Sequence, residues 1–216
     1  GVRRSGKTTL CRALNQTTYV NCDLPSVQQT LADPEMFYQS LKTPRVVLDE
    51  IHQLPEASQI LKIGADHFKK IKILATGSST FVASKKFKDT LTNRKIEILL
   101  TPMISEDLED FTTGKQAINF KHRFLYGGLP PFFLSKSFPE NDIQEWTDSF
   151  WAKDIQELFR LEKKASFEKF FELIMIRSGG IFQATNYSSD CEVSHTTIAN
   201  YLKIMESTYT AYVLKP

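Results

Sequence analysis

The chain has 216 residues, of which 41% are hydrophobic and 24% are charged, and its formal net charge is +2. This length and composition are typical of a globular protein, with room for one large domain or two to three small ones. The small net charge gives no sign of a nucleic-acid partner, and no run approaches the roughly 18 apolar residues that a membrane span needs.

The chain begins with a phosphate-binding pattern. Residues 1–8, GVRRSGKT, match G-x-x-x-x-G-K-S/T. Glycines let backbone N–H groups approach phosphate oxygens closely, Lys7 can reach the β- and γ-phosphates, and the Thr8 hydroxyl can ligate Mg²⁺. The run from Thr9 to Leu14 predicts a helix whose N-terminal dipole points at the anion. We therefore predict a nucleotide site formed by Gly1, Arg3, Arg4, Ser5, Gly6, Lys7, Thr8 and Thr9.

Two strands are predicted next. The first is the β-rich run Thr18–Cys22, and the second is a β-branched run that ends in the carboxylates Asp49 and Glu50. The carboxyl ends of parallel strands are where α/β sheets place their ligands. Asp49 would hold Mg²⁺, directly or through water, and Glu50 would polarise the attacking water.

Each of these two signals has a simpler explanation when taken alone. The carboxylates could end a strand at a polar surface turn, and the phosphate-binding pattern arises by chance in roughly one chain in a hundred of this length. Found together, some forty residues apart, they indicate a nucleotide site. The acidic pair also favours hydrolysis over small-molecule phosphorylation, because a kinase has less use for a water-activating carboxylate.

Two more strands are predicted at Lys72–Thr76 and Lys95–Leu100, with helical segments such as Gln59–Lys70 between strands. Strands that alternate with helices predict an α/β fold, with a parallel sheet and helices on both faces.

The second half of the chain predicts mainly helices. A short helix is expected over Glu106–Phe111, a turn over Tyr126–Pro131, and a long amphipathic helix over 142–162. Its two tryptophans, Trp146 and Trp151, could be base-stacking platforms, but their spacing favours a core stripe.

The last fifty residues are typical of a winged helix, with three helices at Ser166–Ser178, Tyr187–Glu192 and His195–Glu206. The buried face of the third helix would carry Ile198, Tyr201, Leu202 and Met205. A helix-turn-helix suggests that this helix enters a major groove. However, residues 166–216 carry four basic and five acidic side chains, which is a poor match to phosphate-dependent DNA binding. The charge therefore favours a packing module over a DNA contact.

These motifs together resemble those of a known family. In order along the chain, GVRRSGKTTL, VVLDEIHQLP, ILATGSS, YGGLP and VSHTTIANYLKIME resemble a group of bacterial and archaeal predicted ATPases of the AAA+ superfamily. In that group an AAA+ core and a winged-helix segment precede a C-terminal domain related to restriction endonucleases. The resemblance covers nearly the whole chain and is most specific in the ATPase motifs. It implies an ATP-binding core with a sheet of order 5-1-4-3-2, followed by a helical lid.

The resemblance also assigns roles to residues at matching positions. The Walker A and Walker B positions are Gly1, Gly6, Lys7, Thr8, Asp49 and Glu50. Ser78 falls at the sensor-1 position, with Thr76 as the alternative, and Arg94 falls where an arginine finger is placed, although it could equally be a surface arginine in a turn. The implied catalytic residues are Glu50, Lys7, Ser78 and Arg94, with Mg²⁺ held by Thr8 and Asp49.

The implied domains are an ATP-binding core at 1–110, a helical lid at 111–165 and a winged-helix-like segment at 166–216. The endonuclease-like domain is absent, and so is the strand that should precede the phosphate loop. That strand is interior in the implied order, and its loss would leave buried backbone groups unpaired, at about 1–3 kcal/mol each. We therefore expect this sequence to be a fragment cut at both ends, with an apolar strand just upstream of Gly1.

The leading interpretation is a cytoplasmic ATP hydrolase or ATP-driven switch of AAA+ type that uses ATP and Mg²⁺. The resemblance is compatible with a homo-oligomer and with a protein client. The alternatives are a nucleotide-gated binding protein that hydrolyses rarely, which Glu50 argues against, and a DNA-binding regulator. The three cysteines form no C-x-x-C pair and the four histidines do not cluster, so no metal site beyond nucleotide-bound Mg²⁺ is expected.

Overall fold

The computed structural model describes residues 2–77, 91–111, 120–156 and 163–214. The chain forms two compact units, unit 1 (Gly1–Ile143) and unit 2 (Gln144–Pro216). Each unit has its own hydrophobic core.

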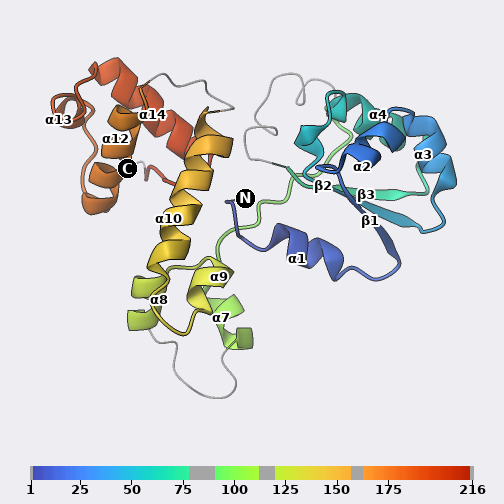
Figure 1. The fold of residues 1–216 in the computed structure, drawn as a ribbon, viewed down its shortest axis with the longest axis horizontal. Helices are drawn as coiled ribbons and strands as arrows, with labels where there is room; N and C mark the ends of the chain where they lie inside the picture. Colours follow the sequence, from blue (N-terminus) through green and yellow to red (C-terminus); the bar gives the residue numbers. More distant parts are fainter. Residues whose placement is uncertain (1, 78–90, 112–119, 157–162, 215–216) are drawn as a thin grey trace. The chain divides into compact units, whose positions relative to one another are not determined.

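Unit 1 begins with helices and strands in alternation, as Figure 1 shows. Its elements up to residue 75 are α1 (Lys7–Arg12), β1 (Thr17–Asn21), α2 (Pro25–Thr30), α3 (Pro34–Ser40), β2 (Arg45–Asp49), η1 (Ile51–Gln53), α4 (Ala57–His67) and β3 (Lys72–Ala75). This confirms the predicted α/β fold and the first three predicted strands to within a residue or two at their ends.

The three strands form a parallel sheet of order β1-β2-β3. Asn21 pairs with Asp49 in the register of β1 and β2, and Leu48 pairs with Ala75 in that of β2 and β3. Helices flank the sheet, with α1 below the strands and α4 above them in the view of Figure 1. The order agrees with the second, third and fourth strands of the sheet that the resemblance implies. The architecture is that of a P-loop NTPase.

The central strand β2 is buried because it has a neighbour on each edge and an apolar β-branched sequence. Its three apolar side chains are fully buried: Val46, Val47 and Leu48. Against this strand pack buried residues of α3 and α4.

A glycine allows α4 to approach the sheet closely. A Cβ added at Gly64 would lie 2.3 Å from the Cδ1 of Ile73 and 2.7 Å from the ring of Tyr38. The hydroxyl of Tyr38 donates to the carbonyl of Ile60 at 3.2 Å, which ties α3 to α4 inside this core. The helices that cover β2 are therefore held at a fixed distance from the strand whose end carries Asp49.

The prediction of a strand at Lys95–Leu100 is wrong. These residues form no strand, and Ile96 and Ile98 are 91% and 82% exposed. A strand needs a neighbour for its backbone hydrogen bonds, and β-propensity alone does not form one.

From residue 105 onward, the described part of unit 1 is mainly helical, with α7 (Ser105–Phe111), α8 (Phe120–Tyr126), α9 (Pro130–Phe133) and the start of α10 (Glu140–Ser149). The predicted helix at 106–111 and the turn between α8 and α9 are confirmed. In that turn Gly127 has a φ of 70°, and the carbonyl of Gly128 accepts a hydrogen bond from the N–H of Met103 at 2.7 Å. The turn is thereby joined to the segment that precedes α7.

Unit 2 contains the end of α10, the π-helix η2 (Phe150–Gln156), α12 (Lys164–Ile176), α13 (Thr185–Ser188) and α14 (His195–Ser207). The predicted long helix at 142–162 thus changes to π-helical winding at Phe150, and 157–162 lie outside the described residues. The two tryptophans belong to the core: Trp146 stacks on Phe150 at 5.4 Å between ring centroids, and Trp151 is buried against Phe167. Core packing, rather than base stacking, explains them.

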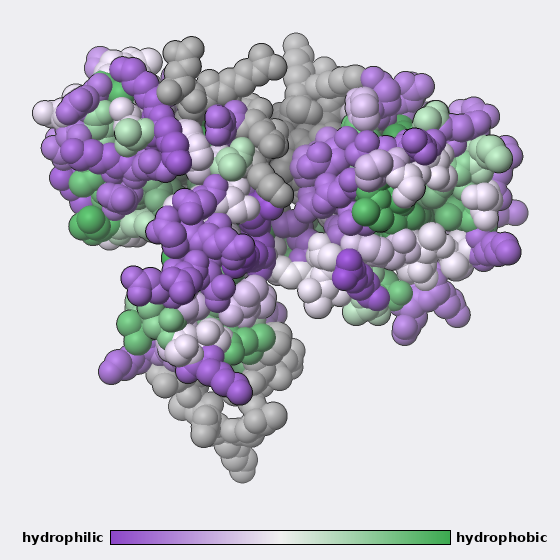
Figure 2. Space-filling view, in the orientation of Figure 1, coloured by the Kyte–Doolittle hydropathy of each residue, from purple (hydrophilic) through white to green (hydrophobic). Residues whose placement is uncertain are grey.

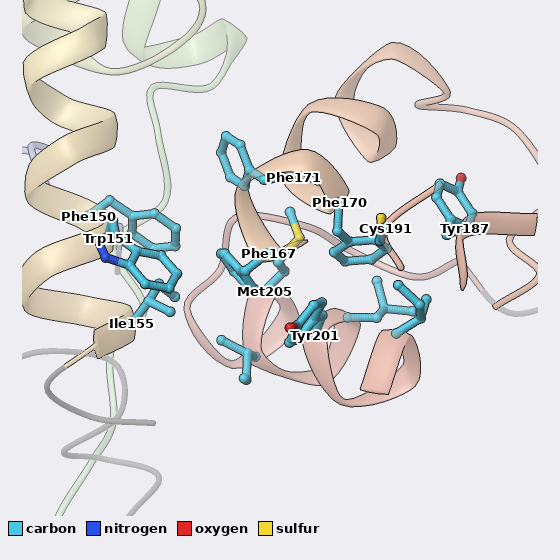
Figure 3. Packing of buried hydrophobic residues seen from close by; sticks show 13 residues of the cluster. Phe150, Trp151, Ile155, Phe167, Phe170, Phe171, Tyr187, Cys191, Tyr201 and Met205 are labelled. Atoms are coloured by element: carbon cyan, nitrogen blue, oxygen red, sulfur yellow. The ribbon is translucent and has the colours of Figure 1, made fainter. Parts of the chain in front are cut away.

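The helices α12 and α14 confirm the first and third helices that the sequence predicts near the C-terminus, whereas α13 shares only Tyr187 and Ser188 with the predicted second helix, whose remaining residues form turns. Ser194 caps α14 by accepting the N–H of Thr197 at 3.1 Å. Figure 3 shows the core that these helices enclose, and all four predicted α14 side chains are buried in it: Ile198, Tyr201, Leu202 and Met205. Residues 208–214 form no strand, so the winged-helix interpretation and a DNA contact stay predictions.

Neither the visible surface nor the cysteines of the described residues indicate a particular function. The visible face of each unit in Figure 2 is mainly hydrophilic, with separate apolar areas. Within the described ranges, no helix combines the length and the apolar character needed to cross a bilayer. All three cysteines are free and buried, and burial raises the pKa of Cys22 to about 12.

Candidate nucleotide-binding site

The phosphate loop turns into α1 at a glycine. Gly6 precedes the first helical residue with φ 94° and ψ 9°, a left-handed conformation that favours glycine. Ahead of it, Val2 and Ser5 are buried, and the N–H of Ser5 donates to the carbonyl of Val2 at 3.3 Å. The predicted helix after the loop is confirmed, although it begins at Lys7. Gly1 lies outside the described residues.

The loop holds two polar groups whose placement suits a phosphate ligand. The ammonium of Lys7 lies over the loop and donates to the carbonyl of Val2 at 2.9 Å. The Oγ of Ser5 is buried and makes no hydrogen bond within the described residues. A buried hydroxyl without a partner costs about 1–3 kcal/mol, which a ligand oxygen at this place would offset. The loop therefore fits an anionic oxygen.

The two arginines of the loop differ in their surroundings. Arg4 has a φ of 64°, and its Nη1 donates to the carbonyl of Asp142 at 3.4 Å. Its guanidinium also lies over the ring of Phe132, 5.9 Å from the centroid. Arg3 is half-buried, and Thr9 is exposed on α1. Arg4 therefore belongs to the phosphate loop and also contacts residues of α9 and α10.

Asp49 is the centre of the site. It ends β2 and is 2% exposed. Its Oδ2 accepts the hydroxyl of Thr8 at 2.8 Å and that of Tyr19 at 2.6 Å, and its Oδ1 accepts the hydroxyl of Thr76. The sequence placed Thr8 and Asp49 in one magnesium site, and the structure brings them into contact across 41 residues of chain.

These contacts set the charge of the carboxyl group. Burial alone would raise the pKa of Asp49, because the charged form loses its hydration. The three hydroxyl hydrogen bonds and the nearby charge of Arg12 outweigh burial and hold this pKa below its ordinary value. Asp49 is therefore an anion at neutral pH, with its oxygens held in place. A charged carboxylate beside a threonine hydroxyl is a donor set that suits Mg²⁺.

Glu50 follows in a left-handed conformation, with φ 55° and ψ 42°. Its N–H donates to the hydroxyl oxygen of Thr76 at 3.1 Å, so one threonine contacts both acidic residues. Its carboxylate Oε2 lies 3.2 Å from the Nδ1 of His52, and its side chain is 31% exposed. The side chain can thus meet solvent at the edge of the site, whereas Asp49 is enclosed.

Of the two remaining candidate catalytic residues, the structure describes Arg94 but not Ser78. Ser78, the expected sensor-1 residue, lies outside the described residues, whereas the alternative, Thr76, contacts Asp49. Arg94 donates from Nε to the Oδ1 of Asp66 in α4 at 2.7 Å. An arginine-finger role for Arg94 stays a prediction.

Sequence reasoning missed Tyr19 and its neighbour Arg12. Burial and the hydrogen bond to Asp49 raise the pKa of Tyr19, which keeps it a donor. The guanidinium of Arg12 lies over the tyrosine ring, 5.0 Å from its centroid. A tyrosine in a β-rich run carries no signal of its own, and only the pairing of β1 with β2 brings it to Asp49. Within the described residues, no group of three or more histidine, cysteine, aspartate or glutamate side chains is placed to hold a metal ion.

Comparison with known families agrees with this geometry. A family model described as an AAA domain matches residues 1–108, and one described as a domain of unknown function (DUF8612) matches residues 118–216. A search of curated proteins gives no match. The first match covers half of the chain and contains the phosphate loop, the three strands and the acidic pair. The chain therefore belongs to the AAA domain family, and its first half is an AAA-type P-loop ATPase domain.

Proposed function

We propose that this chain binds ATP with Mg²⁺ at the phosphate loop and hydrolyses the nucleotide. The observation that carries the proposal is the 2.8 Å hydrogen bond between Thr8 and Asp49. It joins the two residues whose chemistry suits a magnesium ion, one from the start of α1 and one from the end of β2. The orphan hydroxyl of Ser5 and the left-handed Gly6 support a phosphate position beside them.

Each residue of the site would have a separate role in nucleotide binding or hydrolysis. Lys7 would move its ammonium from the carbonyl of Val2 to the β- and γ-phosphates, because a phosphate oxygen is a charged acceptor and a carbonyl is not. Thr8 can donate its proton to Asp49 and keep its oxygen lone pairs for the metal. Bound Mg²⁺ would neutralise charge on the phosphate oxygens. Glu50, at the solvent edge, would orient and polarise the attacking water.

A second candidate is a nucleotide-gated switch that holds ATP and hydrolyses it rarely. The contact between Glu50 and His52 favours it, because one oxygen of the carboxylate is already engaged at 3.2 Å. A single-turnover hydrolysis rate separates the two candidates. A rate that matches steady-state turnover of an ordinary ATPase supports the first, and stoichiometric binding with negligible turnover supports the second.

A further part of the proposal concerns assembly. In a homo-oligomer, Arg94 of one copy would add positive charge at the γ-phosphate of another, which requires its release from Asp66. We also propose a cytoplasmic location, which the three free and buried cysteines support.

The binding step is tested by thermal unfolding with and without Mg·ATP. A ligand at a hundred times its dissociation constant adds about 2.7 kcal/mol, which for a chain of this size shifts the Tm by several degrees. Lys7→Ala should abolish the shift. Lys62→Ala, which changes an exposed lysine of α4, should keep it. A wild-type chain that unfolds cooperatively with no shift contradicts the proposal.

A further inference from the structure

We propose that Tyr19 is a positioning residue of the magnesium site, which holds Asp49 through the tyrosine hydroxyl and is itself braced by Arg12. This role rests on the proposed function, because it concerns the metal that accompanies the nucleotide. Tyr19 lies outside the phosphate loop and the acidic pair, and it comes from the strand beside β2.

The sheet register explains how Tyr19 reaches the carboxylate. Tyr19 pairs with Val47, and Asn21 pairs with Asp49. Paired residues of neighbouring strands share a face of the sheet, and so do Val47 and Asp49, which are two residues apart. Tyr19 and Asp49 therefore lie on one face, separated by one step of about 6.6 Å along the strands. The phenol spans this step, and its hydroxyl lies 2.6 Å from the Oδ2 of Asp49.

The hydroxyl completes a set of three donors on the carboxylate. Thr8 and Tyr19 share Oδ2, and Thr76 donates to Oδ1. A carboxylate has about four acceptor positions, so three of them are filled. Rotation of the carboxyl group would break at least one of these bonds. Tyr19 thus fixes the oxygen that also orients the hydroxyl of Thr8, the residue that would hold the metal.

Arg12 connects this arrangement to the helix that follows the phosphate loop. It is the last residue of α1, and its guanidinium lies 5.0 Å from the centroid of the Tyr19 ring. A cation over an aromatic face is attracted to the ring. The two ends of α1 therefore both reach Asp49, the first turn directly through Thr8 and the last turn through Arg12 and Tyr19. A shift of α1 on phosphate binding would be transmitted to the carboxylate at both points.

The test uses Tyr19→Phe, which removes the hydroxyl and keeps the ring under Arg12. The matched control is Tyr38→Phe, which removes a tyrosine hydroxyl that donates to the carbonyl of Ile60 in the core around α3 and α4. Binding of a fluorescent ATP analogue is titrated in EDTA and at rising Mg²⁺ concentration. For Tyr19→Phe we expect the half-saturating Mg²⁺ concentration to rise about tenfold, as for loss of one hydrogen bond to a charged group. The affinity for the ATP analogue in EDTA should change by less than about twofold, since the contacts between the phosphate loop and the nucleotide do not need the metal.

The outcomes separate this role from the proposed function. An unchanged Mg²⁺ dependence in Tyr19→Phe overturns the role, as does an equal loss of affinity with and without the metal. Tyr38→Phe should behave as the wild type in both titrations. If Tyr19→Phe does not fold, Arg12→Met is titrated instead, with an expected rise of about two- to threefold, and no rise overturns the role. A wild-type chain that binds no nucleotide in either condition overturns the proposed function and this role together.

Discussion

The hydroxyl of Thr76 donates a hydrogen bond to the Oδ1 of Asp49, from the residue just after β3 to the last residue of β2. The hydroxyl oxygen of Thr76 also accepts the N–H of Glu50 at 3.1 Å. One side chain thereby holds the buried carboxylate and the backbone of the acidic residue after it.

Replacing Thr76 by valine should therefore destabilise unit 1. Valine keeps the shape but leaves the buried carboxylate of Asp49 without one donor, and a hydrogen bond to a charged group contributes about 1.5–3 kcal/mol. Thr76→Ser keeps the hydroxyl and should lose much less. Urea unfolding followed by far-ultraviolet circular dichroism measures both variants. Equal stabilities for the valine and serine variants would show that the hydroxyl contributes nothing.

Glu50→Gln should separate binding from hydrolysis. Glutamine cannot accept a proton from water, and general-base catalysis contributes about 10²- to 10⁴-fold, so we expect a rate loss of that size with nucleotide affinity retained. Single-turnover hydrolysis and equilibrium binding are the measurements. Glu35→Gln, an exposed acidic residue of α3, is the control. Wild-type rates in the Glu50 variant would assign water activation to another group.

The pair of Arg94 and Asp66 predicts a pH dependence. The hydrogen bond and charge of Arg94 hold the pKa of Asp66 below its ordinary value of 3.8. Because the folded-state pKa is depressed, the contribution of the pair is fully present above that ordinary value and is lost as the pH falls through the folded-state pKa. Arg94→Met should return the pKa of Asp66 towards 3.8, which carboxyl NMR titration measures. An unchanged pKa would show that the two side chains do not interact in solution.

Phe170 should be the most sensitive position of the unit 2 core that Figure 3 shows. It is fully buried and packs against the rings of Tyr187 and Tyr201, with centroids at 5.5 and 5.9 Å. Phe170→Ala should cost about 3–5 kcal/mol, because it removes a large side chain and leaves a cavity. Ile176→Ala, at a position that is 80% exposed, should stay within about 0.5 kcal/mol of the wild type.

Tryptophan fluorescence is the readout for that comparison, since both tryptophans of the chain lie in unit 2. Unfolding curves of the two variants can thus be followed without a signal from unit 1. A Phe170 variant as stable as the Ile176 variant would mean that the cluster around Phe170 does not stabilise unit 2.

Local sequence was sufficient for much of the fold and for the main parts of the site. The loop at residues 2–8, the apolar run of β2 and the 3.6-residue spacing of α14 act over a few neighbouring residues, so pattern alone predicted them. The two motifs together also predicted that Thr8 and Asp49 share one site. This was possible because Thr8 lies at the start of a helix and Asp49 at the end of a strand.

The remaining features depend on residues far apart in the chain. Tyr19 meets Asp49 only through the register of β1 and β2, and Arg94 pairs with Asp66 across 28 residues. The run at 95–100 has the sequence of a strand, yet it forms none among its described neighbours. Strand pairing and side-chain partners are set by which segments pack together, and a local pattern contains no information on a neighbour that is distant along the chain.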